Sequence, residues 1–371
     1  MPASSPETTH LRFALAVHDK IAGDGADSCF SPYSAASALA LVTRAARGIT
    51  AEEAATVVAG TVDGVADQAE LLRKAAVLTA HTGGEQPELA VSNTLWVWQR
   101  LALNPGFTEE LADWPSGRVA TAPFVDDPEG ARRTINADVA RATHDLIPEL
   151  LPSGSIGADT VASLVNALYL RVAWTFPFAA TNTADGDFHA PARTRRVPMM
   201  RQVERLGYAA GHGWRLVALP ALGGVEAIVL LPERPLAEQE STLDAETLAG
   251  LLSAKRETMV NLALPRLSLD VRSALKPALR ALGVHTMFQP AADFGALSDD
   301  PRLLVSDVSH QAVLRVDESG LEGAAATAVT MRLVSMPVGE PVTVVVDRPF
   351  LLLVRHAGTG ACYFLSRVVE P

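Results

Sequence analysis

One segment near the C-terminus, residues 317–336, combines the alternation of a β-strand with the surroundings of a connection. Apolar or β-branched runs typical of buried strands flank it, at residues 311–316, 343–346 and 350–354. From Leu321 onward, small or apolar residues alternate with a second set that contains Glu322 and Arg332, as in a strand with one buried face. No proline lies within the segment, so nothing there prevents a full ladder of backbone hydrogen bonds. A connection that can also become a central strand indicates a conformational switch.

The composition is that of a folded globular protein with a large core. Hydrophobic residues make up 48% and charged residues 20% of the 371 residues, which is far from the composition of a disordered chain. Length alone would allow two or three domains, but no linker or internal repeat divides the chain, so we predict one domain, residues 1–371. The net charge of −11 argues against a nucleic-acid partner, because phosphate binding needs a basic face.

The N-terminal residues and the cysteines give information about the cellular compartment of the protein. The first twenty residues lack a basic start followed by an apolar core, and no apolar run reaches 18 residues. We therefore expect no membrane partner, and either a cytoplasmic protein or an extracellular form trimmed of its leader. Cys29 and Cys362 are expected to be buried thiols without a disulfide. Only 4 of the 31 basic residues are lysine, which favours a bacterial source and permits a thermostable protein.

Enzymatic motifs are missing from the sequence. We find no G-x-S-x-G, no H-E-x-x-H, no glycine-rich phosphate loop with a lysine and no C-x-x-C pair. The nine histidines are dispersed, and Ser155 is interpreted as a turn residue. The sequence therefore predicts no enzyme, no cofactor and no metal site.

Several motifs follow one another in a fixed order, from about Leu11 to Val369. The most specific is Leu164–Leu170, which is followed by Trp174. The others are Phe30–Ser34, Asn93–Trp96, Ile135–Asn136, Val197–Met200, Leu264–Arg266 and Arg348–Leu351. In this order the motifs resemble those of one family, the serpins, and the alanine-rich start of the segment described first is similar to the start of that family's reactive-centre loop.

The resemblance implies both a fold and a mechanism. The fold is α+β, with three β-sheets, eight or nine helices and a reactive-centre loop, about residues 318–341, that is exposed or inserted. In the mechanism, a serine protease attacks the loop as a substrate and forms an acyl-enzyme. The cleaved loop then inserts as a strand into the central sheet and traps the protease. This implies a metastable monomer whose partner is the covalently bound protease. The alternative is a non-inhibitory serpin that acts as a carrier or chaperone.

The family's usual spacing from Gly320 places the reactive bond between Val334 and Ser335. The loop is a few residues longer than is common in the family, so other residues before the bond remain open: Leu333, Met336 and Arg332. An apolar residue at this position would suit an elastase-like, chymotrypsin-like or subtilisin-like protease, and an arginine would suit a trypsin-like one. We expect an apolar residue, and therefore elastase-like or chymotrypsin-like targets.

Three further sets of residues match the family's moving parts. The loop hinge, which must enter the sheet, comprises Glu318, Gly320, Leu321, Glu322, Gly323, Ala324, Ala325, Ala326, Thr327 and Ala328. The shutter, a buried polar cluster whose hydroxyl, amide and imidazole groups can exchange partners as strands separate, comprises Ser31, Ser34, Asn166 and His310. The breach, where the loop first enters, comprises Trp174, Arg266 and Glu318. Two hinge residues depart from the family pattern, since Leu321 is larger than usual and Gly323 replaces an alanine.

Two shutter residues also have simple structural interpretations. Ser31 precedes Pro32, the arrangement of a helix N-cap followed by proline at the first helical position. Asn166 can be a core amide with all its hydrogen bonds satisfied. Either role is compatible with membership of the shutter.

Overall fold

The computed structural model describes residues 5–23, 25–83, 86–111, 117–157, 160–322 and 340–371. Nine α-helices lie in these parts of the chain: α1 (Pro6–Ile21), α2 (Pro32–Ala45), α3 (Gly48–Ala59), α4 (Gly64–Ala75), α5 (Pro105–Leu111), α6 (Pro128–Ala142), α7 (Leu236–Gln239), α8 (Ala245–Ala254) and α9 (Leu275–Ala281). Short 3-10 helices are η1 (Ala180–Asn182), η2 (Leu222–Gly224), η3 (Glu240–Thr242) and η4 (Thr286–Phe288). None of the helices in the described ranges is long and apolar enough to cross a membrane.

Three helices begin with the same local signal, a polar N-cap followed by proline. The pairs are Ser5 with Pro6, Ser31 with Pro32 and Asp127 with Pro128, at the starts of α1, α2 and α6. In each, the N-cap side chain accepts a hydrogen bond from a backbone N–H of the first turn. The predicted cap at Ser31 is therefore confirmed.

The larger sheet has nine strands in the order β1-β15-β14-β8-β7-β6-β9-β13, with β5 paired to β6. Its strands are β1 (Ser28–Phe30), β5 (Ala184–His189), β6 (Thr194–Gly211), β7 (Trp214–Ala221), β8 (Val225–Pro232), β9 (Arg256–Pro265), β13 (Val342–Val345), β14 (Phe350–His356) and β15 (Cys362–Val368). We expected three sheets. Within the described residues the hydrogen bonds form two, because the 18-residue β6 runs without a break from its pairing with β5 to its pairing with β7.

The smaller sheet has six strands in the order β10-β11-β12-β4-β2-β3. Its strands are β2 (Glu88–Trp98), β3 (Gly117–Ala122), β4 (Ala162–Ala173), β10 (Leu267–Ala274), β11 (Val308–Val316) and β12 (Gly320–Leu321). The runs predicted as strands around residues 311–316, 343–346 and 350–354 correspond to β11, β13 and β14.

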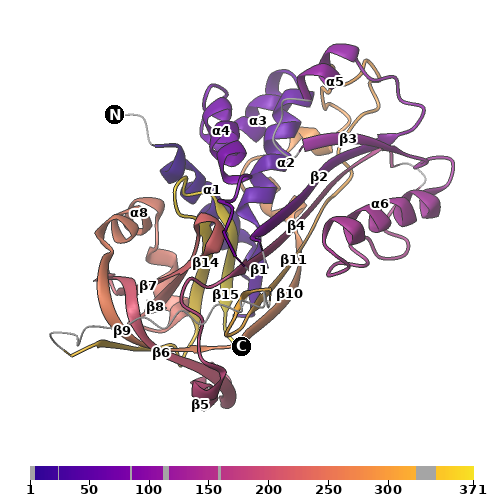
Figure 1. The fold of residues 1–371 in the computed structure, drawn as a ribbon. Helices are drawn as coiled ribbons and strands as arrows, with labels where there is room; N and C mark the ends of the chain where they lie inside the picture. Colours follow the sequence, from indigo (N-terminus) through magenta and orange to yellow (C-terminus); the bar gives the residue numbers. More distant parts are fainter. Residues whose placement is uncertain (1–4, 24, 84–85, 112–116, 158–159, 323–339) are drawn as a thin grey trace.

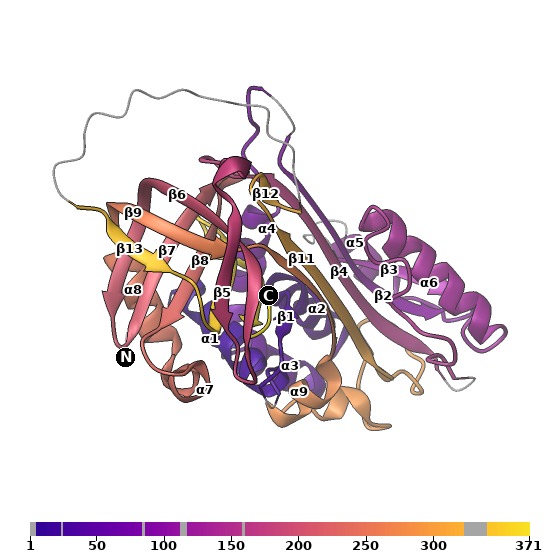
Figure 2. The ribbon, with the colours of Figure 1, turned by 90° about the horizontal axis from the view of Figure 1, so that it is seen from below.

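Helices cover both faces of the six-stranded sheet, with α6 on one face and α2 on the other (Figures 1 and 2). Under α6 lies a separate apolar cluster in which Ile135 and Val139 of the helix meet Trp96 of β2 and Val165 of β4. The opposite face belongs to the main hydrophobic core, which includes almost the whole of α2. The two layers leave β4 and β11 buried at the centre of the molecule.

Candidate functional site

The candidate site is the boundary between β4 and β11, the two central strands of the smaller sheet. At one end, residues 308–310 of β11 pair in parallel with residues 164–166 of β4. At the other end, Leu321 of β12 pairs antiparallel with Val172 on β4 and with Val316 on β11. A two-residue strand therefore separates two strands that pair directly further along the sheet (Figure 2).

Gly320, the first residue of β12, has no room for a side chain. A Cβ at this position would lie 2.1 Å from the carbonyl oxygen of Val172, so any other residue would collide with the backbone of β4. The turn before it is held by Asp317, whose Oδ1 accepts hydrogen bonds from the backbone N–H of Ser319 at 2.8 Å and of Gly320 at 3.1 Å. The glycine predicted for the hinge is thus required by the closeness of the two backbones.

The next two hinge residues behave differently from each other. Leu321 is fully buried, so the larger side chain at this position is already part of the core. Glu322 has φ of +66°, a left-handed conformation that costs a non-glycine residue roughly 1–2 kcal/mol. Its N–H donates to the carbonyl oxygen of Arg315 at 2.8 Å, and its carboxylate lies 3.5 Å from the Arg315 guanidinium. Burial raises the pKa of the Glu322 carboxyl, and the nearby Arg315 partly offsets this.

The predicted breach residues meet around the turn that leads into β12. The indole Nε1 of Trp174 donates to the carbonyl oxygen of Asp317 at 2.8 Å. The backbone N–H of Trp174 donates to the carbonyl oxygen of Ser319 at 2.9 Å. The carbonyl oxygen of Glu318 accepts from the N–H of Phe178 at 2.9 Å. The chain at the start of the hinge is therefore fastened, through its backbone carbonyl oxygens, to the segment that follows β4.

The Glu318 carboxylate links its own segment to two others that are distant in the sequence, through Arg266 and Thr183. Arg266 approaches it in a forked arrangement, with Nε at 3.0 and 2.9 Å from the two oxygens and Nη2 at 2.7 Å from Oε1. The hydroxyl of Thr183 donates to Oε1 at 2.5 Å. Burial acts to raise the pKa of Glu318, but the hydrogen bonds from Arg266 and Thr183 outweigh it and hold the pKa below its ordinary value. The carboxylate is therefore charged at neutral pH.

Two of the predicted shutter residues, Asn166 and His310, form a row with Asn93 across three strands. Asn166 of β4 stands opposite His310 of β11 on one side and Asn93 of β2 on the other. The Asn166 amide donates to the carbonyl oxygen of Ser34 at 2.7 Å and to Oδ1 of Asn93, and its Oδ1 lies 3.0 Å from Nδ1 of His310. All four residues are buried. These hydrogen bonds join β2, β4 and β11 on the face of the sheet that packs against α2.

The hydrogen bonds define the state of His310. The backbone N–H of Ser31 donates to its Nε2 at 3.0 Å, so that nitrogen carries no proton. The proton of the neutral ring is therefore on Nδ1, which donates to Oδ1 of Asn166. Burial lowers the pKa of His310 to about 4, because a charged imidazole would lose its hydration there.

The serines contribute to the shutter mainly through their backbone. The hydroxyl of Ser31 caps α2 by accepting from the N–H of Ser34 at 3.1 Å, while the Ser31 N–H and the Ser34 carbonyl contact His310 and Asn166. We expected hydroxyl groups at these contacts. The difference arises because the Ser31 hydroxyl is used for the helix cap, while the Ser31 N–H is one of the first N–H groups of the helix, which have no partner within it.

Two participants were missed from the sequence. Asn93 belongs to a motif that was recognised only as a strand, although three consecutive polar residues, 92–94, between apolar ones were a signal. Thr183 lies 135 residues before Glu318, half-buried directly after η1, and nothing in the local sequence marks it. The remaining predicted positions lie outside the described residues: Gly323, Ala324, Ala325, Ala326, Thr327 and Ala328 of the hinge, and Arg332, Leu333, Val334, Ser335 and Met336 around the reactive bond.

The described residues give little support for a reactive cysteine or for a metal site. Cys29 and Cys362 are both free and buried, and burial raises the pKa of each thiol to about 12, which makes a reactive thiolate unfavourable. In the parts of the chain that the structure covers, no group of three or more histidine, cysteine, aspartate or glutamate side chains is arranged to hold a metal ion.

Comparison with known proteins gives consistent matches along nearly the whole chain. The family described as serpin (serine protease inhibitor) matches residues 8–371. An alpha-1-antitrypsin-like protein of Tamias sibiricus is 32% identical over 386 residues, covering 100% of this chain and 90% of that protein. Alpha-1-antiproteinase of Ovis aries is 32% identical, with 97% and 86% covered.

Solved structures agree in fold at lower identity. Human thyroxine-binding globulin in complex with thyroxine has a TM-score of 0.87 at 22% identity, covering 99% of this chain and 98% of that one. The thermophilic serpin Tengpin in its native state has a TM-score of 0.86 at 22% identity, with 98% and 94% covered. Uncleaved ovalbumin has a TM-score of 0.85 at 22% identity, with 99% and 100% covered.

Proposed function

The chain belongs to the serpin family, and we propose that it is a suicide-substrate inhibitor of serine proteases. A protease would attack the reactive-centre loop and form an acyl-enzyme. The cleaved loop would then insert between β4 and β11 and carry the protease with it before deacylation. In this proposal the chain is not an enzyme, and its partner is a covalently bound protease.

The observation that carries the proposal is the pairing of β12 with both neighbours. Leu321 pairs with Val172 and with Val316, and the row of Asn166 and His310 lies six residues further along on each strand (172 to 166, 316 to 310). The equal spacing means that a strand continued from Leu321 keeps the same register on both sides and needs no bulge. Such a strand would replace the direct pairing of β4 with β11.

The energy of insertion is sufficient to drive such a change. About a dozen inserted residues with neighbours on both sides could form on the order of ten to twenty backbone hydrogen bonds, each worth ~1 kcal/mol net. That sum is comparable with the total stability of a domain, so the native state would be held by a kinetic barrier. An inhibitor that uses the free energy of loop insertion to trap a protease needs such a metastable native state.

The finer parts of the proposal rest on the sequence. We propose that Val334 and Ser335 form the reactive bond, that the targets are elastase-like or chymotrypsin-like, and that the protein acts as a monomer with residues 1–371 in one domain. The low lysine content supports the further proposal of a bacterial source. The hinge, shutter and breach keep the roles assigned to them above.

The test uses denaturing gels after incubation with elastase, chymotrypsin, subtilisin and trypsin. We expect a covalent band that survives denaturation, and a released C-terminal fragment whose mass corresponds to a start at Ser335. The variant Ala326→Pro serves as a matched control, because proline removes a backbone donor and blocks a central strand without changing the reactive bond. Cleavage of the unaltered protein with no covalent band and no loss of protease activity would contradict the proposal.

A non-inhibitory role as a carrier or chaperone is the second candidate. One observation favours it: Glu322 is left-handed, so its backbone must change before the hinge can extend beyond Leu321. The similar fold of thyroxine-binding globulin, which binds thyroxine, is compatible with it. This candidate expects cleavage in the loop without trapping, for the unaltered protein and for Ala326→Pro alike.

A further inference from the structure

The segment that follows α6 crosses the outer face of the two central strands. We call residues 146–151 the strap. Ile147, Leu150 and Leu151 of the strap belong to the same apolar cluster as Val165 of β4, and Val313 of β11 packs against this cluster. The strap therefore covers the boundary between β4 and β11 on the face opposite α2.

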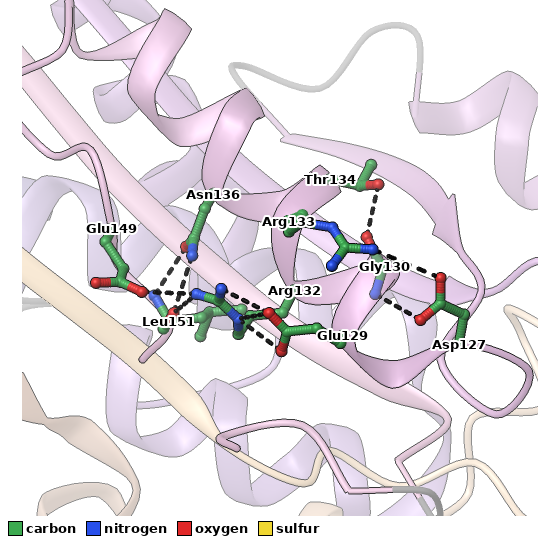
Figure 3. A network of polar contacts seen from close by, with 9 residues as sticks. All are labelled: Asp127, Glu129, Gly130, Arg132, Arg133, Thr134, Asn136, Glu149 and Leu151. Carbon is green, nitrogen blue, oxygen red and sulfur yellow. Dashed lines mark hydrogen bonds and ion pairs between the residues drawn. The ribbon is translucent and has the colours of Figure 1, made fainter. Parts of the chain in front are cut away.

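One end of the strap is bound to α6 by side chains of that helix (Figure 3). Nη1 of Arg132 donates to the Glu149 carboxylate at 2.7 Å and to the carbonyl oxygen of Leu151 at 2.9 Å. The amide of Asn136 both donates to the carbonyl oxygen and accepts from the N–H of Leu151, each at 2.9 Å. The strap and α6 thus form one polar network.

The other attachment is to β10, on the far side of β11. Nη2 of Arg272 donates to the carbonyl oxygen of Glu149 at 2.6 Å, and its Nε donates to Oε1 of Gln311 at 3.1 Å. Arg272 pairs with Gln311 across β10 and β11, next to the pairing of Ser273 with His310. The strap is therefore fastened at the level where β4 and β11 pair directly.

The two attachments lie on opposite sides of the boundary. α6 packs on β2, β3 and β4, whereas Arg272 belongs to the strands beyond it. An added strand would move β10 and β11 away from β4 by about 4.8 Å, the spacing of neighbouring strands. A hydrogen bond of 2.6 Å between Arg272 and the Glu149 carbonyl cannot persist through that displacement while α6 stays in place.

We propose that Arg272 and the strap form a latch that sets the rate at which the sheet opens for a new strand. This inference rests on the proposed function, since it concerns the opening that strand insertion requires. The latch is a chain of two links in series: Arg272 joins β10 to the strap, and Arg132 and Asn136 together join the strap to α6. Breaking either link releases the strap, and breaking the second link then adds nothing.

The series arrangement gives a sharp test. A synthetic peptide with the sequence of residues 320–333 is mixed with the intact protein, and its uptake is followed on native gels. Loss of one charge-assisted hydrogen bond at the barrier corresponds to about a tenfold change in rate. We expect Arg272→Ala to speed uptake by about that factor, and Arg132→Ala to speed it less, because Asn136 still holds Leu151. The combination of Arg132→Ala with Asn136→Ala breaks the whole second link, and adding Arg272→Ala to that variant should give no further increase.

Arg133→Ala is the matched control. Arg133 lies on α6 beside Arg132, but its guanidinium faces Asp127 at 3.9 Å, away from the strap (Figure 3). We expect its uptake rate to equal that of the unaltered protein. An equal acceleration by Arg133→Ala, or multiplied effects when Arg272→Ala is added to the variant that lacks Arg132 and Asn136, would show general loosening of α6 and overturn the latch.

The outcomes also separate the latch from the proposed function. Uptake by the unaltered protein at the same rate as by Arg272→Ala would overturn the latch and leave the inhibitory proposal standing. No uptake by any variant, together with cleavage by proteases without trapping, would contradict strand insertion itself and the latch with it.

Discussion

His310 and Asn166 are joined by a buried hydrogen bond of 3.0 Å between the two strands that an inserting loop must separate. The bond lies on the face of the sheet next to α2, at the same level at which Arg272 fastens the strap on the opposite face. The boundary between β4 and β11 is therefore fastened on both faces at the level of Asn166 and His310. This level lies six residues along each strand from Val172 and Val316, the residues that pair with Leu321 of the hinge.

The first prediction concerns Asn166→Ala. This change removes the partner of His310 Nδ1, of the Ser34 carbonyl and of Asn93, and leaves buried polar groups without hydrogen bonds. We expect a loss of about 3 kcal/mol in the free energy of unfolding, read as a lower midpoint in denaturant. Ser309→Ala is the control, since its hydroxyl bonds Asp307 at the surface, and should change stability by less than about 0.5 kcal/mol. Equal midpoints for both variants would contradict the role given to Asn166.

The second prediction concerns pH. The pKa of His310 is about 4 in the folded protein and about 6.5 in an unfolded chain, so the unfolded chain binds more protons between these values. Stability contributed by neutral His310 is complete above pH 6.5 and is lost as the pH falls toward 4, by an amount on the order of 3 kcal/mol.

The variant His310→Gln isolates this effect. Its unfolding free energy should fall less between pH 6.5 and pH 4 than that of the unaltered protein, because the shared contribution of the carboxylates cancels in the comparison. His10 is also buried, and burial is the main cause that lowers its pKa to about 4. The matched variant His10→Gln should therefore show the same smaller fall in unfolding free energy. Parallel stability curves for His310→Gln and the unaltered protein would contradict a neutral, buried His310.

Much of this arrangement could be predicted from the sequence, for identifiable reasons. The strands around the loop are runs of apolar residues with flanking turns, and their burial follows from local composition. Ser31 with Pro32 is a short-range signal that predicts the start of α2 without knowledge of the rest of the chain. The assignment of Asn166 and His310 to one cluster depended on the resemblance to a family, since no local pattern brings residues 144 positions apart together.

Other features depend on tertiary geometry and could not be predicted. The requirement for Gly320 comes from the carbonyl oxygen of Val172, and the continuity of the larger sheet comes from the length of β6. The left-handed backbone of Glu322 contradicts the simple alternation expected for the segment, because alternation describes an extended strand and the described hinge is extended only to Leu321.

The third prediction concerns Gly320→Ala. The added Cβ would lie 2.1 Å from the Val172 carbonyl oxygen, so β12 must leave its place between β4 and β11. We expect a loss of about 2 kcal/mol in stability and a shift from covalent trapping toward simple cleavage by a target protease. Gly250→Ala in α8 is the control, because a Cβ there meets no atom within 4 Å and should add up to about 1 kcal/mol of stability. Unchanged trapping and stability in Gly320→Ala would show that β12 has no part in insertion.

The fourth prediction concerns the coupling of Glu318 with Arg266. The side chain of Glu318 is only 11% exposed, whereas that of Arg266 is 48% exposed, so solvent screens the pair in part. We therefore expect a coupling free energy of about 1 kcal/mol from a double-mutant cycle with Glu318→Ala and Arg266→Ala. Because hydrogen bonds lower the pKa of Glu318, the coupling should be present at neutral pH and disappear as the pH falls through that lowered pKa.

Thr183→Val separates the ion pair from its neighbour. The hydroxyl donates to the same Glu318 oxygen as Arg266, so its loss should reduce stability by about 1 kcal/mol while leaving the coupling between Glu318 and Arg266 in place. Arg196→Ala, which removes an exposed pair with Asp187, is the control for general loss of surface charge. A coupling near zero would mean that the carboxylate is held by Thr183 and the backbone alone, and that Arg266 does not fasten the base of the hinge.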